Sequence, residues 1–373
     1  MKIERVLMTG DTVGGVWTFT MELAEALAAR NIEVLLVALG AKASPAQLAE
    51  AASIPGLRLL DSAFRLEWMP EPWADLEASG RWLLEIEREF RPDVIHLNSF
   101  GHGNLPWSAP VVVTAHSCVL SWWQAVKGEP APDSWNRYQQ LVAQSLTAAD
   151  LVTAPSGAMA KAICKYYGLS NDSCRVLPNG RSTAKFEPRS KEPFVFTAGR
   201  LWDEAKNVQA VARIAAKLSW PVYFAGDTTE SAGSSSLPCT GGCNMLGRLP
   251  ACDVAEWYAR ASIYVMPAHY EPFGLSILEA ALSGCALVLG DIPSLREIWG
   301  DAALFVAPSD SAALQCGIQE LIDDTPKREQ LSRRAYARAL GFNASRMSQA
   351  YLAAFHDAIA ASSIKVRSLQ CAS

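Results

Sequence analysis

The chain has 373 residues, of which half are hydrophobic and 19% are charged. This length favours two domains, and this composition is typical of folded globular proteins rather than disordered ones. The formal net charge of −5 gives no general attraction for nucleic acid or for an anionic membrane. No apolar run approaches the ~20 residues of a membrane-spanning helix. We therefore expect a cytoplasmic protein without a transmembrane segment, and keep peripheral contact with the inner membrane face as an alternative.

The nine cysteines are scattered and odd in number, which indicates reduced thiols rather than a disulfide framework. Cys239, Cys243 and Cys252 form the one group that could suggest zinc ligands. Their spacing matches no common zinc motif, and no histidine is near them in the sequence. We therefore predict no metal site and no bound cofactor.

Short runs of aliphatic and β-branched residues alternate with amphipathic stretches along nearly the whole chain. This alternation predicts an α/β fold with parallel sheets that helices cover on both faces. The predicted strands lie at 6–8, 34–37, 93–97, 111–114 and 151–153, and then at 194–198, 222–225, 263–266, 286–289 and 303–306. The predicted helices lie near 17–29, 75–90, 134–148, 156–167, 327–341 and 345–361.

A charged segment with two prolines, residues 185–193, separates the two series of strands. Such a composition is typical of an exposed linker between domains. We therefore predict two Rossmann-like domains, at 1–187 and 188–345. A final helix, within 346–373, is expected to pack back on the first domain.

Ligands of doubly wound sheets bind in the loops beyond the carboxyl ends of the strands. Gly14 and Gly15 follow the first predicted strand and open a helix, where backbone N–H groups can approach an anion. The loop matches neither the dinucleotide-binding fingerprint nor a P-loop. A plain turn explains the two glycines equally well.

Several aromatic and imidazole side chains follow strands in the first half. His116 comes after the strand at 111–114, and this position favours a hydrogen-bond donor or general acid over a purely structural histidine. His102 lies in an earlier loop of the same kind. Trp122 and Trp123 could stack on a sugar ring. We therefore predict that these two tryptophans and His102 contact a sugar-containing substrate, in the role of an acceptor. Packing inside the domain is the alternative for both tryptophans.

Arg200 and Lys206 flank the turn after the strand at 194–198. Both cations can reach one site near a helix N-terminus, which suits a pyrophosphate. Two solvated surface charges are the alternative. The position after a strand favours the binding site.

The stretch 269–284 is the most informative part of the sequence. Pro272 and Gly274 break the chain after a strand, and a helix follows that ends at a glycine. Glu271 precedes this helix and Glu279 lies within it, so the two carboxylates can contact different ends of one ligand. Carboxylates accept hydrogen bonds from the vicinal hydroxyls of a ribose or hexose. The alternative, two carboxylates that only interact with the helix dipole and solvent, does not explain the proline and the glycine.

Together these motifs resemble the retaining glycosyltransferases of GT-B fold, and the whole chain is similar to glycosyltransferase family four. Glu271 and Glu279 fit the E-x7-E signature, and Arg200 with Lys206 fits the diphosphate-binding pair. The segment 177–180 matches the family's element at the end of the first domain. One departure follows it. The family usually has an apolar residue and an aspartate there, whereas this chain has Arg181-Ser182, so a role for that aspartate does not carry over.

The resemblance implies a GT-B architecture, with two parallel sheets that face one another across a cleft. The first domain would hold the acceptor and the second the nucleotide-sugar donor. The resemblance also implies a role for each candidate residue.

In the first domain, Gly14 and Gly15 would approach the donor phosphates or the acceptor, and His116 would lie beside the transferred sugar. In the second domain, Arg200 and Lys206 would neutralise the pyrophosphate, and Glu279 would hold the ribose. Glu271 and the backbone of Phe273, Gly274 and Leu275 would hold the donor sugar, and the backbone of Arg248 and Leu249 would face the base.

The function that follows is transfer of a hexose from a UDP-, GDP- or ADP-sugar, with retention of anomeric configuration. The acceptor would be a glycan, a lipid-linked sugar or a small molecule, as in polysaccharide or glycoconjugate biosynthesis. Because the sequence contains no Asp-x-Asp motif, we expect the enzyme to need no metal. The alternatives are a nucleotide-sugar epimerase or phosphorylase of the same fold, and a non-catalytic module that binds a sugar nucleotide or a glycan.

Overall fold

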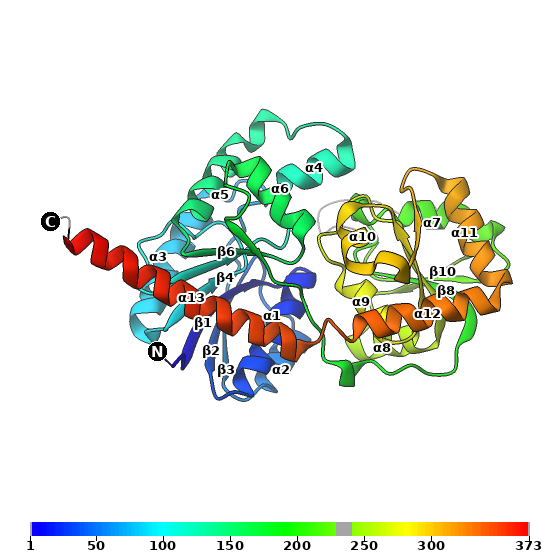
Figure 1. Cartoon of the computed structure of the whole chain (residues 1–373), viewed down its shortest axis with the longest axis horizontal. Coiled ribbons are helices and arrows are strands. Elements are labelled where there is room, and N and C mark those ends of the chain that lie inside the picture. The colour runs from blue at the N-terminus through cyan, green and yellow to red at the C-terminus, as the bar shows by residue number, and fades with distance from the viewer. Residues whose placement is uncertain (1, 229–240, 372–373) are drawn as a thin grey trace. The chain divides into compact units, whose positions relative to one another are not determined.

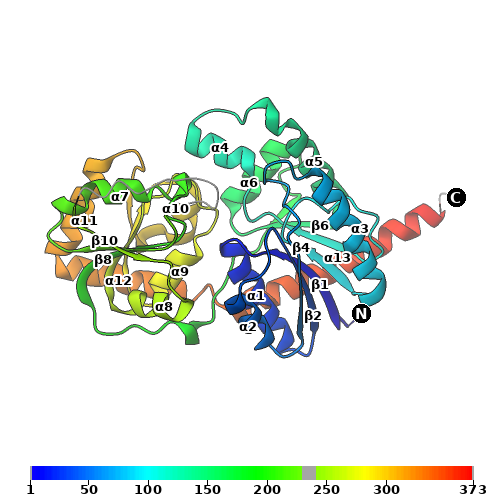
Figure 2. The ribbon, with the colours of Figure 1, turned by 180° about the vertical axis from the view of Figure 1, so that it is seen from behind.

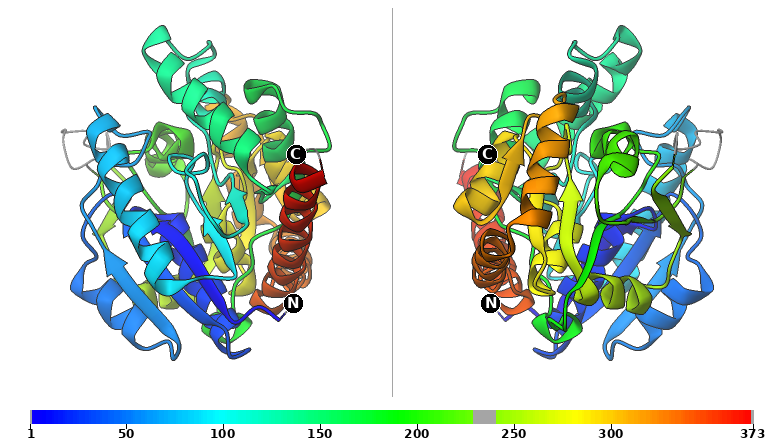
Figure 3. Two further views of the ribbon diagram at one scale, coloured as in Figure 1. Left: turned by 90° about the vertical axis from the view of Figure 1, so that its left-hand side faces the viewer. Right: turned by 90° about the vertical axis from the view of Figure 1, so that its right-hand side faces the viewer.

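The computed structural model describes residues 2–228 and 241–371 and contains two α/β units. The first unit comprises Met1–Gln124, Glu129–Gly180 and Ala344–Ser373, and the second comprises Ala125–Gly128 and Arg181–Asn343. Each unit has one wholly parallel sheet, so the predicted fold class is confirmed. Figure 3 brings the first unit to the front in its left panel and the second in its right panel.

The sheet of the first unit has seven strands in the order β3-β2-β1-β4-β5-β6-β7. Chain order therefore reverses direction between β1 and β4, which are neighbours. This reversal makes a topological switch point at the carboxyl ends of the two strands. The strands are β1 Arg5–Asp11, β2 Glu33–Leu39, β3 Leu57–Asp61, β4 Val94–Leu97, β5 Val111–Thr114, β6 Leu151–Ala154 and β7 Cys174–Val176.

Helices cover both faces of the first sheet. The last helix, α13, packs on α1 and on the central strands β4, β5 and β6. It crosses in front of the sheet in Figure 1, whereas α3 is in front in Figure 2. The helices of this unit are α1 Gly15–Ala28, α2 Pro45–Ala52, α3 Trp73–Phe90, α4 Val119–Lys127, α5 Asn136–Ala148, α6 Gly157–Tyr167 and α13 Ala344–Cys371.

The sheet of the second unit repeats the same topology with six strands, in the order β10-β9-β8-β11-β12-β13. Its switch point therefore lies between β8 and β11. One apolar layer packs beneath α8, α9 and α12, and another beneath α7 and α11. The elements are β8 Glu192–Ala198, α7 Val208–Ile214, β9 Val222–Ala225, β10 Cys243–Gly247, α8 Ala251–Arg260, β11 Ala261–Met266, α9 Leu275–Leu282, β12 Ala286–Gly290, α10 Pro293–Trp299, β13 Leu304–Val306, α11 Ser311–Asp323 and α12 Thr325–Ala339.

Three strands were absent from the sequence prediction, namely β3, β7 and β10. All three are edge strands. Apart from the buried Cys174, their residues are partly buried or exposed, and β7 has only three residues. Buried central strands of a parallel sheet have continuous apolar runs, and edge strands do not, which explains the omission.

The boundary between the units differs from the predicted linker. The first unit ends at Gly180, and residues 185–193 belong to the second unit. Phe186 is 7% exposed and joins the apolar core of that unit. The ammonium group of Lys191 donates hydrogen bonds to the carbonyl oxygens of Tyr258, Ala259 and Ser283. Most of the segment is exposed, as its composition predicted, but Phe186 and Lys191 attach it to the second unit, where Lys191 caps the carboxyl ends of two helices.

No helix in the described ranges is both long enough and apolar enough to cross a bilayer.

One buried carboxyl group holds a loop of the first unit. Glu67 is 3% exposed, and its Oε1 accepts a hydrogen bond from the backbone N–H of Phe100 at 2.9 Å. Its Oε2 is buried and has no hydrogen-bond partner among the described residues. Burial raises the pKa of Glu67 above its ordinary value, although backbone hydrogen bonds oppose the shift. The folded protein therefore binds this proton more tightly than the unfolded chain does.

We predict that Glu67→Gln changes the free energy of unfolding more favourably at neutral pH than at acidic pH, relative to the wild type. The folded-state pKa is raised, so the contribution of Glu67 to stability is present below its unfolded pKa and is lost as the pH rises through its folded pKa. Glutamine does not titrate and removes this loss, at about 1.4 kcal/mol per pKa unit. Urea unfolding at about pH 5 and about pH 8 measures the difference. The exposed Glu89→Gln is the control, and an equal effect of Glu67→Gln at both pH values would contradict the prediction.

Candidate functional site

Two loops meet at the switch point of the second sheet. One follows β8 and the other follows β11. The backbone N–H groups of His269 and Tyr270 donate to the carbonyl oxygen of Ala205 at 2.8 and 3.3 Å. Because β8 and β11 are adjacent and parallel, side chains from both loops are brought to one place.

Lys206 and Glu271 form an ion pair that joins these two loops. The Lys206 Nζ lies 2.5 Å from Glu271 Oε2, and the side chains are only 17% and 11% exposed. The other carboxylate oxygen accepts from the backbone N–H of Phe273 at 3.3 Å. The Ser294 hydroxyl donates to the Glu271 carbonyl oxygen at 2.5 Å. The carboxylate is therefore fixed at both oxygens, and its main chain is held as well.

Arg200 lies in the same loop as Lys206 and is held by Asp203. Its guanidinium contacts Asp203 Oδ2 at 2.9 Å, and Asp203 Oδ1 accepts from the backbone N–H of Ala205 at 3.0 Å. Burial alone would raise the pKa of Asp203, but Lys206 and Arg200 outweigh it and the pKa is lowered. Sequence reasoning missed Asp203, although an acid three residues after a candidate phosphate-binding arginine was a usable signal.

Helix α9 begins at Leu275, directly after Gly274, whose backbone conformation favours glycine. Gly274 has φ +91°, and a Cβ there would lie 2.7 Å from Ile277 Cδ1. The first backbone N–H groups of α9, from Leu275 and Ser276, have no acceptor within the helix. They remain candidate donors to a ligand. The Phe273 N–H, which we also expected to face the sugar, is bonded to Glu271 in this structure.

Glu279, the carboxylate expected to hold the ribose, is paired with Arg181. The Arg181 Nε lies 3.0 Å from Glu279 Oε1, and the side chains are 12% and 15% exposed. The Arg181 guanidinium also makes a cation–π contact with Phe186, because its central carbon lies 5.2 Å from the centre of the ring. Arg181 is the residue at which the sequence departs from the family pattern. The departure therefore places a cation against the second carboxylate of the E-x7-E signature.

Arg248 and Leu249 follow the edge strand β10. The Arg248 side chain is 73% exposed, and its guanidinium lies 3.9 Å from Asp227. Leu249 is partly buried against the core of the second unit. The predicted contact with the base involves only their backbone atoms, so it stays a prediction.

In the first unit, His116 lies at the carboxyl end of β5 and contacts a side chain at the end of β4. The His116 Nε2 is 2.8 Å from Asn98 Oδ1, and its ring packs against Phe19 with the centroids 4.6 Å apart. Burial lowers the pKa of His116 to about 3. The ring is therefore neutral at physiological pH in the ligand-free protein, and its predicted role as hydrogen-bond donor or general acid stays a prediction. Sequence reasoning missed Asn98.

Gly14 and Gly15 are exposed at the end of β1 and the start of α1. Gly14 has φ +100°, which a side chain would rarely allow. The Asp11 carboxylate accepts from the Val13 N–H at 2.9 Å and shapes the turn before them. The amino end of a 14-residue helix is thus accessible beside β1, as an anion site requires.

The structure corrects the predicted place of His102. This side chain is 1% exposed, its Nε2 lies 2.8 Å from the Ser79 hydroxyl, and burial lowers its pKa to about 4. It lies inside the first unit and cannot contact an acceptor at the surface. Trp122 and Trp123 lie on α4, partly exposed, with ring centroids 5.8 Å apart.

Among the described residues, no three His, Cys, Asp or Glu side chains are grouped so that they could hold a metal ion. Cys239 of the zinc alternative lies outside the described residues. Cys243 is next to the carbonyl oxygen of Ala212, at 3.7 Å, and Cys252 is exposed. Cys243 and Cys252, the two described cysteines of the zinc alternative, thus belong to no cluster of metal ligands.

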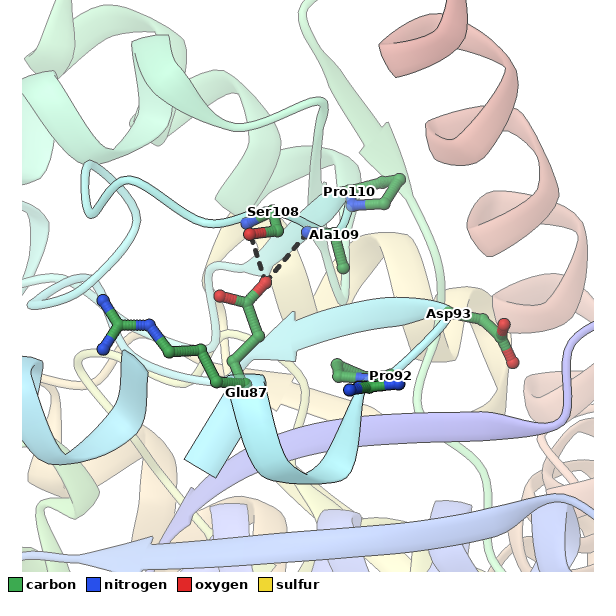
Figure 4. A pocket seen from close by; sticks show the side chains of 8 residues that line it. Glu87, Pro92, Asp93, Ser108, Ala109 and Pro110 are labelled. Carbon is green, nitrogen blue, oxygen red and sulfur yellow. Dashed lines mark hydrogen bonds between the residues drawn. The ribbon is translucent and has the colours of Figure 1, made fainter. Parts of the chain in front are cut away.

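A surface cavity of the first unit lies at the amino ends of β4 and β5, the edge opposite to the loops described above. Figure 4 shows Glu87 in it, with hydrogen bonds from the backbone N–H groups of Ser108 and Ala109 at 2.7 and 2.9 Å. This carboxylate is already used to fix the loop before β5. The cavity therefore has a structural explanation and adds nothing to the candidate site.

Comparison with protein families covers both units. Residues 13–185 match "Glycosyltransferase Family 4", and residues 180–338 match "Glycosyl transferases group 1". The chain belongs to glycosyltransferase family four. The resemblance inferred from the E-x7-E signature is thereby confirmed.

Curated relatives of this chain include glycosyltransferases, and solved structures share its fold. The chain is 27% identical to the glycogen synthase of Mycobacterium tuberculosis over 285 residues, which cover 68% of this chain and 66% of that protein. The matched regions span between 26% and 66% of the length of the first curated relatives. The sucrose-phosphate synthase of Thermosynechococcus elongatus superposes with a TM-score of 0.78 at 19% identity, over 95% of this chain and 99% of that one. Anabaena HepE, in complex with UDP and glucose, gives a TM-score of 0.74 at 18% identity over 95% and 100% of the chains. The predicted GT-B fold is confirmed.

We predict that Lys206→Met destabilises the ligand-free protein by about 3 kcal/mol, because removal of one partner leaves the other charge buried without compensation. The double variant Lys206→Met/Glu271→Gln should recover much of this loss. Urea unfolding of both single variants and the double variant forms a double-mutant cycle. Strictly additive effects would show that the ion pair does not couple the two loops.

Proposed function

We propose that this family-four protein transfers a hexose from a nucleotide-diphosphate sugar to a hydroxyl group of an acceptor. The observation that carries the proposal is the convergence, at the switch point of the second sheet, of Arg200, Lys206, Glu271 and the amino end of α9. Ligands of doubly wound folds bind at this point. Two cations, free amide donors and a buried carboxylate suit a ligand that carries both phosphates and sugar hydroxyls.

The diphosphate of the donor would bind to the two cations. Arg200 has 39% of its side chain exposed and is oriented by Asp203, so its remaining N–H groups can reach a phosphate. The Lys206 ammonium is neutralised by Glu271 in the free protein. A bound phosphate would share this ammonium, and the first-turn N–H groups of α9 would donate to the same ligand. The carboxylate thus keeps the ammonium in place until the donor arrives.

The sugar and the ribose would each be held by one carboxylate. Glu271 would accept hydrogen bonds from hydroxyls of the transferred hexose. Glu279 would accept them from the ribose, with Arg181 fixing its carboxylate at 3.0 Å. The backbone at Arg248 and Leu249 would face the base, and the UDP-, GDP- and ADP-sugars are the candidate donors.

In the transfer step, the bond between the anomeric carbon and the β-phosphate oxygen breaks, and its electron pair leaves with the diphosphate. The acceptor oxygen forms the new bond to the anomeric carbon. The acceptor proton passes to the departing phosphate oxygen. Negative charge therefore grows on the leaving group, and preorganised cations and amide dipoles stabilise it. Retention of anomeric configuration is what the family resemblance implies for this step.

Metal independence is part of the proposal. Many sugar transferases bind a divalent ion at an Asp-x-Asp motif to stabilise the leaving diphosphate, and this sequence has no such motif. Arg200, Lys206 and the amino end of α9 would provide the same electrostatic stabilisation. The acceptor would stack on the exposed parts of Trp122 and Trp123.

Donor binding is tested by thermal denaturation with UDP-, GDP- and ADP-hexoses. A donor at a hundred times its dissociation constant should add about 2.7 kcal/mol to the free energy of unfolding. Glu279→Gln should reduce this gain, because the amide offers the ribose hydroxyls one uncharged acceptor oxygen in place of two charged ones. The exposed Glu329→Gln on α12 is the matched control and should keep it. A chain that no sugar nucleotide stabilises would contradict the proposal, and conversion of the donor without an acceptor would favour the epimerase alternative.

The role of the two cations is tested by turnover. We expect Arg200→Ala to lower kcat roughly 10²-fold, because charge on the leaving diphosphate is no longer compensated. Arg213→Ala, the same change on the exposed face of α7, should leave kcat unchanged. Chelation of divalent ions should also leave the wild-type rate unchanged. Strict dependence on magnesium or manganese, or full activity of Arg200→Ala, would contradict this part of the proposal.

A further inference from the structure

Three polar residues form a hydrogen-bonded chain at the carboxyl edge of the first sheet. Thr9, Asn98 and His116 lie at the ends of the adjacent strands β1, β4 and β5. The Asn98 backbone N–H donates to Thr9 Oγ1 at 3.0 Å, and Asn98 Nδ2 donates to the Thr9 carbonyl oxygen at 2.7 Å. His116 Nε2 lies 2.8 Å from Asn98 Oδ1. The amide of Asn98 thus connects the main chain of β1 to the imidazole ring.

The orientation of this amide is determined by its partner on β1. A carbonyl oxygen can only accept a hydrogen bond, so the group of Asn98 that faces the Thr9 carbonyl must be the NH₂ group. The amide oxygen therefore faces His116. Rotation of the amide by a half-turn would place two oxygens together and lose the 2.7 Å hydrogen bond. Asn98 is 6% exposed, so water cannot readily compensate for that loss.

The amide oxygen in turn determines the tautomer of His116. Since this oxygen only accepts, the hydrogen bond requires a proton on His116 Nε2. In a neutral imidazole the second nitrogen, Nδ1, then has a lone pair and no hydrogen. Burial against Phe19 favours the neutral ring. No described residue is a hydrogen-bond partner of Nδ1, and the side chain is partly exposed.

We propose that Asn98 is a positioning residue that fixes His116 as the Nε2–H tautomer, so that Nδ1 accepts a hydrogen bond from a hydroxyl group of the sugar substrate. This inference rests on the proposed function for the identity of the ligand. The tautomer itself follows from the hydrogen bonds of the first unit alone. A neutral acceptor nitrogen favours a hydroxyl group, which donates, over a carboxylate, which only accepts.

The tautomer is tested by nuclear magnetic resonance of the ligand-free protein labelled with ¹⁵N in histidine. The sequence has five histidines, and the signals of His116 are identified by their loss in His116→Gln. We expect a proton on Nε2 and an unprotonated Nδ1 at neutral pH. In Asn98→Leu the amide oxygen is gone, and the ring should show both tautomers. A proton on Nδ1 in the wild type, or an unchanged tautomer in Asn98→Leu, would overturn the inference.

A further variant separates positioning from general effects on folding. Thr9→Val removes the hydroxyl that accepts from the Asn98 backbone N–H, but keeps the carbonyl that orients the amide. It should therefore leave the tautomer unchanged. A shift of the tautomer in Thr9→Val would contradict the assigned path through the carbonyl.

Kinetics supply the second readout. Loss of one well-oriented hydrogen bond should raise the donor KM roughly 3- to 10-fold in Asn98→Leu. The donor KM of Thr9→Val should stay near that of the wild type. An unchanged donor KM in Asn98→Leu would contradict the role of Nδ1 in binding. Failure of the wild type to bind any sugar nucleotide would instead contradict the proposed function. The magnetic resonance experiment still tests whether Asn98 fixes the tautomer of His116, because it needs no ligand.

Discussion

The ion pair between Lys206 and Glu271 is the interaction on which the arrangement of the second unit's ligand-binding edge depends. Each residue lies in a loop after a different strand, and each is largely buried. A buried ammonium or carboxylate alone would be costly, so each charge stabilises the position of the other. The backbone hydrogen bonds from His269 and Tyr270 to Ala205 reinforce the same junction. The pair therefore keeps a cation and a carboxylate at the switch point before any ligand is present.

The two units have the same sheet topology, but the side chains at the carboxyl edges of their sheets differ in charge. In the second unit the edge is charged, with Arg200 and Lys206 balanced by Asp203 and Glu271. In the first unit the corresponding polar groups, Thr9, Asn98 and His116, form neutral hydrogen bonds. Charges suit phosphates, and neutral donors and acceptors suit sugar hydroxyls. The two edges therefore differ in the ligand groups that they suit, although both sheets place β1 and β4, or β8 and β11, at the same switch point.

Arg181 shows how one departure from a family pattern changes a site without removing it. Where the family pattern has an apolar residue, this chain has a guanidinium that lies 3.0 Å from the Glu279 carboxylate. The ring of Phe186 packs behind the guanidinium, 5.2 Å from its carbon. Phe186 lies in the segment 185–193, whose composition indicated a solvated linker, and Arg181 lies four residues before this segment. The local sequence could not show that the segment is attached to the second unit, because Lys191 contacts carbonyl oxygens 68 and 92 positions away.

The sequence by itself determined the two α/β units, the central strands and the loops that carry Arg200, Lys206, Glu271 and Glu279. Continuous apolar runs, a proline and glycine before a helix, and charges after strands are local signals, and a local signal can be found without coordinates. Only the tertiary structure decided the edge strands β3, β7 and β10, the burial of His102, and the partners of Asp203, Asn98 and Arg181. These features depend on which strands become neighbours. A parallel sheet joins segments that are distant in the chain, so the contacts at its carboxyl edge have no counterpart in sequence spacing.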